Sequence, residues 1–178
     1  EITGRIFTLP CLLARFEDIG IVTREQALKL GLVGMAARSS GLFRDVRISH
    51  PFQFYRNFPV QPVYHTSGDV LARAQQRKKE VEESIRIIQK LIANWKESKT
   101  AVTLPSYYNK HQPSKFAISL TEGWRGEICH IAVTNAEGKI QHYKIKDASF
   151  HNWMALALAV RNQEISDFPL CNKSYNLS

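Results

Sequence analysis

Apolar and polar residues alternate with a period of two in three stretches between residues 114 and 148. These stretches are Phe116–Glu122, Glu127–Thr134 and Lys139–Lys146. Such alternation is typical of strands with two different faces. Asn135–Gly138 has the residues of a tight hairpin turn, in which Gly138 supplies a left-handed conformation. The pattern therefore predicts a small three-stranded antiparallel sheet.

A helical period replaces this alternation over residues 68–95. The apolar positions of the stripe are Val81, Ile85, Ile88, Ile92 and Trp95. Their spacing is that of one face of an amphipathic helix, and Asp69 or Ser67 can cap its first turn. We expect this stripe to be buried and to contribute much of the core. The first half of the helix is far more polar, so we expect water or a partner to cover it.

Shorter elements are predicted before the long helix. Thr23 and Gln26 form a capping box for a helix that ends at Gly31. Residues 36–41 are small and polar, which favours a loop. Three prolines exclude a regular helix over residues 51–64.

Two further elements are predicted after the sheet. Ser149 can cap a helix from Phe150 to about Arg161. This helix is apolar on nearly all sides, so we expect it to be buried. The tail over residues 165–170 is expected to be extended, because Pro169 disfavours helix before it.

These patterns predict an α+β fold that is mainly helical, with one long amphipathic helix and the small sheet, in a single domain over residues 1–178. Residues 1–95 are expected to be mainly helical, 96–113 to be a polar linker, 114–148 to form the sheet, and 149–178 to hold the buried helix and the tail. The chain begins at Glu1 rather than at a methionine. It has the character of a piece of a longer protein.

Composition narrows the classes of function. The formal net charge is +8, but the basic residues are scattered apart from Arg77–Lys79, which argues against a nucleic-acid-binding domain. No apolar run is long enough to cross a membrane. Three distant cysteines without a CxxC pair indicate reduced thiols in a reducing compartment, most simply the cytosol. No HExxH, phosphate-binding loop or GxGxxG motif is present.

Glu122–Glu127, with the sequence EGWRGE, is the most informative segment. Gly123 and Gly126 allow a tight turn and a close approach to another surface. The turn would present the planar, permanently charged head of Arg125. Two interpretations are open: an ordinary hairpin with a solvated arginine, or an arginine held toward a ligand.

Several segments, in order, resemble one protein family. They are Asp18–Gly31, Ala37–Arg47, His50–Tyr55, Gly68–Ile88, Glu122–Glu127 and the helix from Ser149. Together they are similar to the large subunit shared by nickel–iron hydrogenases and respiratory complex I. The branch that they resemble most is that of membrane-associated energy-converting hydrogenases and formate hydrogenlyase. The resemblance covers roughly Leu12–Ser178.

The resemblance also bears on cofactors. Hydrogenase members hold nickel and iron through two CxxC pairs, and this chain begins after the first pair would occur. Where the family has Asp-Pro-Cys, this chain has Asn176–Ser178, and a serine cannot replace a bridging thiolate. We therefore expect no nickel–iron site and no other metal site in this chain. The iron–sulfur cluster is expected on a partner subunit.

The resemblance also implies site residues. Arg125 and Glu122 would line the redox cavity, and a neighbouring segment with Arg38, Asp45 and Arg47 would pack its wall. A second group is expected at the interface with the iron–sulfur subunit: Asp69, Arg73 and Arg77. The alternative is that these residues form ion pairs only within the fold. No residue of the chain is expected to be catalytic.

The expected function is that of a hydrogenase-like or NADH-quinone oxidoreductase-like large-subunit component of an electron-transfer complex. The complex would be peripheral on the cytoplasmic face of the cell membrane. Its partners would be an iron–sulfur small subunit and other subunits, with no nucleic acid. The alternative is a non-catalytic scaffold or interaction subunit descended from the same family.

Overall fold

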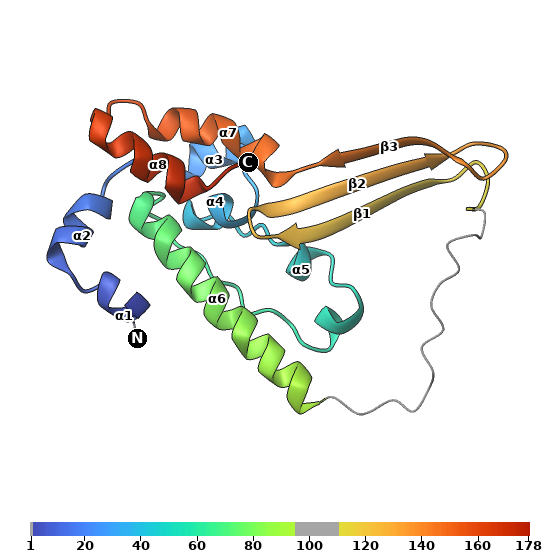
Figure 1. Cartoon of the computed structure of the whole chain (residues 1–178), viewed down its shortest axis with the longest axis horizontal. Coiled ribbons are helices and arrows are strands. Elements are labelled where there is room, and N and C mark those ends of the chain that lie inside the picture. The colour runs from blue at the N-terminus through green and yellow to red at the C-terminus, as the bar shows by residue number, and fades with distance from the viewer. Residues whose placement is uncertain (1, 95–110) are drawn as a thin grey trace.

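Helices surround the base of an antiparallel sheet that projects to one side in this computed structural model (Figure 1). The structure describes residues 2–94 and 111–178, so most of the predicted linker over 96–113 lies outside the described residues. The α-helices are α1 (Ile2–Ile6), α2 (Pro10–Phe16), α3 (Arg24–Leu30), α4 (Gly34–Ser39), α5 (Val46–Ser49), α6 (Val70–Ala93), α7 (Ala148–Ala159) and α8 (Phe168–Tyr175). Short 3₁₀ turns cover Gln53–Arg56 and Ile165–Asp167. The α+β class with one long helix is confirmed.

The predicted sheet is present with its expected connections. Its strands are β1 (Phe116–Gly123), β2 (Gly126–Thr134) and β3 (Ile140–Lys146), in the order β1-β2-β3. Glu122 pairs with Glu127, and Gly123 pairs with Gly126. Only Trp124 and Arg125 therefore connect the paired ends of β1 and β2. At the far end Gly138 has a φ of +73°, as the hairpin prediction requires.

Two of the three helix caps predicted from local sequence are confirmed. Thr23 and Gln26 form a reciprocal capping box at α3, which ends at Gly31 in a left-handed conformation. The side chain of Asp69 accepts a hydrogen bond from the amide of Ala72 at the start of α6. These caps fix where α3 and α6 begin, and both helices contribute to the buried core together with α4, α7 and α8.

The loop predicted over residues 36–41 is wrong. Residues 34–39 form α4, and every one of them is buried. Small side chains such as those of Ala36 and Ala37 let this helix pack closely against its neighbours, including α6. Burial outweighs the local preference of Ser39 and Ser40 for irregular structure, since their hydroxyls donate to carbonyls of Ala36 and Val22.

The expected burial of α6 is reversed along the helix. Val81, Ile85, Ile88 and Ile92 are 42%, 50%, 53% and 69% exposed, so the predicted apolar stripe is not part of this core. Trp95 lies outside the described residues. The polar first half is the buried one, because α4 and α8 pack against it. Arg73 and Gln76 are both completely buried there.

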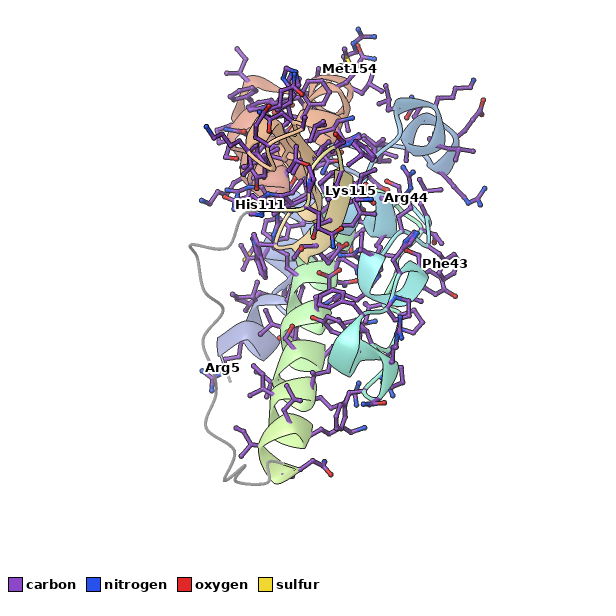
Figure 2. All side chains as sticks on the ribbon, turned by 90° about the vertical axis from the view of Figure 1, so that its right-hand side faces the viewer. Arg5, Phe43, Arg44, His111, Lys115 and Met154 are labelled. Carbon is purple, nitrogen blue, oxygen red and sulfur yellow. The ribbon has the colours of Figure 1, made fainter. Side chains whose placement is uncertain are left out.

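The C-terminal elements differ from the expectation in three ways. α7 is capped by Asp147 rather than by Ser149, whose amide donates to the Asp147 side chain. The helix buries one face only, with Phe150 and Met154 73% and 58% exposed. Figure 2 shows Met154 at the outer edge of the molecule. The tail is not extended, because Pro169 lies in the first turn of α8, where a helix loses no hydrogen bond to proline.

Candidate functional site: an anchored arginine beside a buried charge cluster

The β1–β2 turn lies directly on the first residue of α4. Gly34 has a φ of +63° and Gly126 a φ of +130°, conformations that L-residues with side chains rarely adopt. A Cβ atom on Gly34 would lie 2.2 Å from the Cα of Gly126. The contact is possible only because both Gly34 and Gly126 lack a side chain. It fixes the position of Arg125, the residue before Gly126, relative to the helices.

Arg125 is half-buried and anchored from two sides. Its Nε donates a hydrogen bond to the main-chain oxygen of Asn176, the left-handed residue that ends α8. The buried side chain of Asn152 on α7 donates from Nδ2 to the carbonyl oxygen of Arg125 over 3.4 Å. Among the described residues, no hydrogen bond or ion pair involves the two terminal nitrogens of this guanidinium.

Arg38 is the centre of a buried charge cluster, which we define as Arg38, Asp45, Arg47, Glu80 and Glu122. The Nε of Arg38 donates to Glu80 over 2.7 Å, and its Nη1 donates to Glu122 over 2.8 Å. Asp45 lies 3.6 Å from the same nitrogen. Burial alone would lower the pKa of Arg38, but the surrounding carboxylates hold it above its ordinary value. The guanidinium therefore joins α4, α6 and β1.

Two carboxylates of this cluster, Glu122 and Asp45, have opposite pKa shifts. Burial raises the pKa of Glu122, an effect that the nearby Asp45 increases and that Arg38 only partly offsets. Burial would also raise the pKa of Asp45, but its hydrogen bonds from Arg47 and the charge of Arg38 lower it overall. Arg47 donates to both oxygens of Asp45, over 2.9 Å and 2.6 Å. Thus Glu122 is the carboxylate of the two that accepts a proton more readily.

Glu122 also connects the cluster to the turn. Its second oxygen accepts from the amide of Val46 at the start of α5 over 3.1 Å. The structure thus brings together Arg38, Asp45, Arg47 and Glu122, four of the five residues proposed for the cavity. Arg125 follows Glu122 by three residues but contacts α7 and the C-terminal segment instead.

The three residues proposed for a subunit interface occupy different environments. Asp69 and Arg73 are 4% and 0% exposed. Arg73 donates to the carbonyls of Gly68 and Gly20 over 2.7 Å and 3.0 Å, and burial lowers its pKa. Asp69 is occupied as the cap of α6. Arg77 alone of the three lines an open surface, and it donates to a carbonyl of α8, that of Ser174.

The cysteines do not form a metal site within the described residues. Cys11 is exposed on α2, Cys129 lies on β2, and Cys171 is buried in α8, where its thiol points at the carbonyl of Ala159 over 3.7 Å. The hydroxyl of Ser178 lies 3.2 Å from that of Ser149. No group of three or more His, Cys, Asp or Glu residues in the described part could hold a metal ion. These donors do not fit a nickel–iron centre.

Sequence reasoning missed several residues on which the site depends. Glu80 forms an ion pair with Arg38 over 2.7 Å, but in sequence it is one charge in a polar stretch. Asn152 lies in the middle of an apolar helix. That isolated amide was a usable signal, because a polar side chain on a buried face needs partners. Gly34 had no signal of its own, since its contact comes from a distant turn.

Comparison with known proteins places the chain in a family. Residues 4–115, more than half of the chain, match the family of the 49 kDa subunit of respiratory-chain NADH dehydrogenase. A carbon monoxide-induced hydrogenase from Rhodospirillum rubrum is 30% identical over 96% of this chain and 46% of its own length. Formate hydrogenlyase subunit 5 from Escherichia coli is 28% identical over 96% of this chain and 29% of its own length.

The fold is shared with a solved structure. A chain of the membrane-bound sulfane sulfur reductase, described as an archaeal respiratory membrane complex, has a TM-score of 0.87, with 24% identity over 98% of this chain and 48% of that one. This chain spans less than half the length of these relatives. No helix of residues 2–94 and 111–178 is long and apolar enough to span a bilayer. The chain belongs to the family of the 49 kDa subunit of respiratory-chain NADH dehydrogenase, as the resemblance predicted.

Proposed function

We propose that this chain is part of a large subunit in a membrane-associated electron-transfer complex, in which Arg125 binds a polar or anionic group in the redox cavity. The observation that carries this proposal is the state of Arg125. Its backbone and Nε are anchored, while its two terminal nitrogens have no partner among the described residues. A guanidinium fixed in advance stabilises developing negative charge without reorganisation during the reaction.

The charge cluster has a supporting role in this proposal. Arg38 holds Glu122 at the end of β1, and Glu122 is three residues from Arg125. The cluster thus keeps the strand end and the turn on α4 and α5. The cluster positions these segments, because its members form hydrogen bonds and ion pairs with one another and with the backbone.

The proposal extends to partners and location. Electrons would arrive from an iron–sulfur cluster on a small subunit, and the assembly would be peripheral on the cytoplasmic face of the cell membrane. We propose no nickel–iron centre for this chain, because its described cysteines do not converge. Relatives named as hydrogenases and as NADH-quinone oxidoreductases support the redox class in common.

The test is substitution of Arg125 in the assembled complex, with quinone reduction and hydrogen evolution both measured. Arg125→Ala should lower turnover on the order of 100-fold, as the loss of one preset donor does. Arg125→Lys keeps the charge but loses the planar fork, so it should also impair turnover. Within residues 2–94 and 111–178, the one side-chain hydrogen bond that the substitution removes is that to Asn176, at a cost of about 0.5–1.5 kcal/mol. Arg161→Ala, an exposed arginine on the same protein, is the matched control.

Normal turnover of Arg125→Ala in a fully assembled complex would end the proposal. The second candidate is a scaffold subunit that holds other subunits without a redox role, which the scattered cysteines favour. In that case every Arg125 variant would leave turnover unchanged. Removal of the whole chain would then lower the yield of assembled complex.

A further inference from the structure

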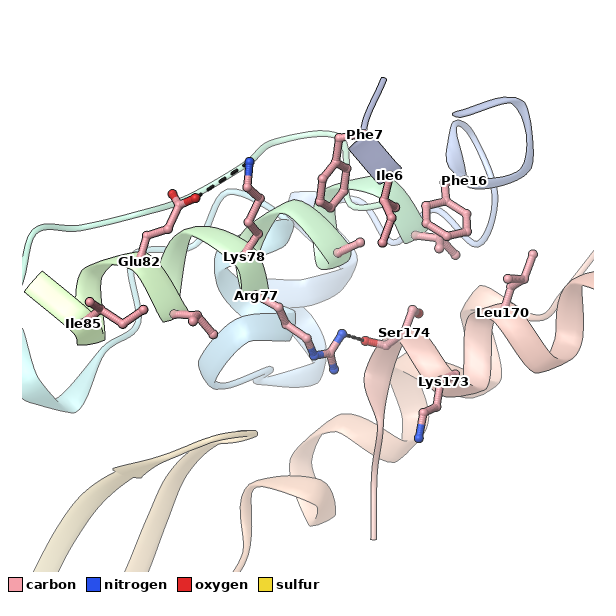
Figure 3. A pocket seen from close by; sticks show the side chains of 13 residues that line it. Ile6, Phe7, Phe16, Arg77, Lys78, Glu82, Ile85, Leu170, Lys173 and Ser174 are labelled. Carbon is pink, nitrogen blue, oxygen red and sulfur yellow. Dashed lines mark hydrogen bonds and ion pairs between the residues drawn. The ribbon is translucent and has the colours of Figure 1, made fainter. Parts of the chain in front are cut away.

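The buried charge cluster holds one more negative than positive charge when all of its members are ionised. Its carboxylates are those of Asp45, Glu80 and Glu122, and its guanidiniums are those of Arg38 and Arg47. Among residues 2–94 and 111–178, no third lysine or arginine forms an ion pair with these carboxylates. Arg77 precedes Glu80 by one turn of α6, but its guanidinium donates to the carbonyl of Ser174 on α8 instead (Figure 3). A buried excess charge is unfavourable, and the binding of a single proton removes it.

Glu122 is the carboxylate of the cluster that is best placed to take this proton. Its side chain is 4% exposed, whereas that of Glu80 is 14% exposed. The two oxygens of Glu122 accept one hydrogen bond each, from Arg38 and from a backbone amide. Asp45 accepts three hydrogen bonds from Arg47, which favour its charged form. The raised pKa of Glu122 and the lowered pKa of Asp45 agree with this difference in surroundings.

A cavity of about 280 Å³ lies against Glu122, between α5 and the ends of β1 and β2. It has room for several water molecules, and part of its lining is polar. His50 is an exposed residue of its wall, so protons can pass from solvent to Glu122 through this space. Apart from Glu80, which lies behind Arg38, the charged and titratable groups that face Glu122 are Arg38, Arg44, Asp45, Arg47, His50 and Glu127.

Glu122 is close enough to Arg125 to respond to charge there. Three residues of extended chain span at most about 11 Å, which limits the distance between the Cα atoms of Glu122 and Arg125. One unit of negative charge at about this distance raises the pKa of a carboxyl group by about 1, for an effective dielectric constant of about 20. The contact between Gly34 and Gly126 keeps the turn and the cluster at this separation. Negative charge on a group held by Arg125 therefore favours protonation of Glu122.

We propose that Glu122 is a proton-uptake site, which binds a proton from solvent when an electron reaches the group held by Arg125 and releases it when that charge leaves. The inference rests on the proposed function, because the electron comes from the redox chain of the assembled complex. Each uptake forms one O–H bond on the Glu122 carboxylate and consumes one proton from solvent. The electron stays on the bound group, so the cluster itself is neither oxidised nor reduced.

Infrared spectroscopy of the assembled complex tests the proposal through the carbonyl stretch of protonated carboxyl groups. The complex is titrated with pH in its oxidised state and in its electrochemically reduced state. One band of the wild type should be absent from Glu122→Gln, and its titration midpoint should lie about 1 pH unit higher in the reduced state. Glu137→Gln is the matched control and should keep the band, because Glu137 is an exposed glutamate in the β2–β3 turn.

The pH profile of turnover gives a second measurement. Wild-type turnover should fall as pH rises above the midpoint of Glu122, because the carboxylate then no longer binds a proton. Glu122→Gln should lower turnover about 10-fold below this midpoint, the factor that corresponds to 1 pKa unit, and should abolish this pH dependence. Glu122→Asp keeps a titratable carboxyl group and should retain a pH-dependent profile. A purely structural role would instead lower turnover by the same factor at every pH.

Three results would overturn the proposal: no band that Glu122→Gln removes, a midpoint that is the same in both redox states, or a wild-type pH profile in Glu122→Gln. Arg125→Ala distinguishes these failures from failure of the proposed function. If Arg125→Ala loses turnover and the wild-type midpoint does not move on reduction, Arg125 keeps its role and Glu122 takes up no proton. If Arg125→Ala has normal turnover and the wild-type midpoint does move, the proposed function fails and Glu122 remains a proton-uptake site.

Discussion

Replacing Arg38 with methionine tests how the buried charge cluster holds the site together. The guanidinium is 4% exposed and donates to Glu80, to Glu122 and to the carbonyl of Arg44, over 2.7 Å, 2.8 Å and 2.7 Å. Methionine fills similar space but supplies no donor. Removing one partner of a buried ion pair costs about 3–5 kcal/mol. We expect Arg38→Met to lose this much unfolding free energy at pH 7.

The cost should not reach the sum for three separate pairs. Asp45 keeps its two hydrogen bonds from Arg47, and Glu122 can take up a proton because its pKa is already raised by burial. The double variant Arg38→Met, Glu122→Gln removes one unpaired carboxylate. It should therefore recover at least about 1 kcal/mol relative to the single variant.

Urea denaturation followed by circular dichroism measures these differences. The matched control is Arg161→Met, because that arginine is exposed and its loss should change stability by less than about 0.5 kcal/mol. If Arg38→Met behaves like the control, the cluster contributes no net stability. If the double variant loses the sum of the two single losses, Arg38 and Glu122 are not coupled, and the reasoning from their 2.8 Å contact is refuted.

Two further predictions concern the turn and the cluster. Gly126→Ala should cost roughly 1–3 kcal/mol in thermal unfolding, because its Cβ would lie 2.7 Å from the Cα of Gly34. The control Gly4→Ala should be nearly neutral, because a Cβ there has no neighbour within 4 Å. Similar melting of both variants would contradict this prediction. Because the pKa of Glu122 is raised in the folded protein above its ordinary 4.5, its contribution to stability is present below that pH and is lost as pH rises through the folded pKa. The stability of Glu122→Gln relative to wild type should therefore rise as pH increases from about 4.5 to 7 in urea titrations, and a constant difference would refute the assigned direction.

Local signals in the sequence correctly predicted the features that depend on local chemistry. The box at Thr23 and Gln26 and the cap at Asp69 involve residues only three apart, so each can be recognised without the fold. The same holds for the hairpin at Asn135–Gly138. The charge cluster was a different case. Arg38, Asp45 and Glu122 were found through family resemblance, because 84 residues separate Arg38 from Glu122.

Non-local packing explains what the sequence could not predict. Hydrophobicity placed the core at Ile85 and Ile88, but the chain buries Arg73 and Gln76 instead, because carbonyls of other segments accept their hydrogen bonds. A buried arginine is tolerated once each donor has a partner. Whether such partners exist depends on the fold. Periodicity therefore predicted the existence of α6 correctly and its buried face wrongly.

The reversal along α6 separates the fold of the chain from its assembly. The polar half carries Arg73 and Glu80 and connects α6 to α4, to α8 and to the charge cluster. The apolar half carries the exposed stripe, and its stabilising burial would come from contact with another helix. Substitutions in the polar half should consequently affect folding and the position of the turn, whereas substitutions of the exposed stripe should change the stability of this chain much less.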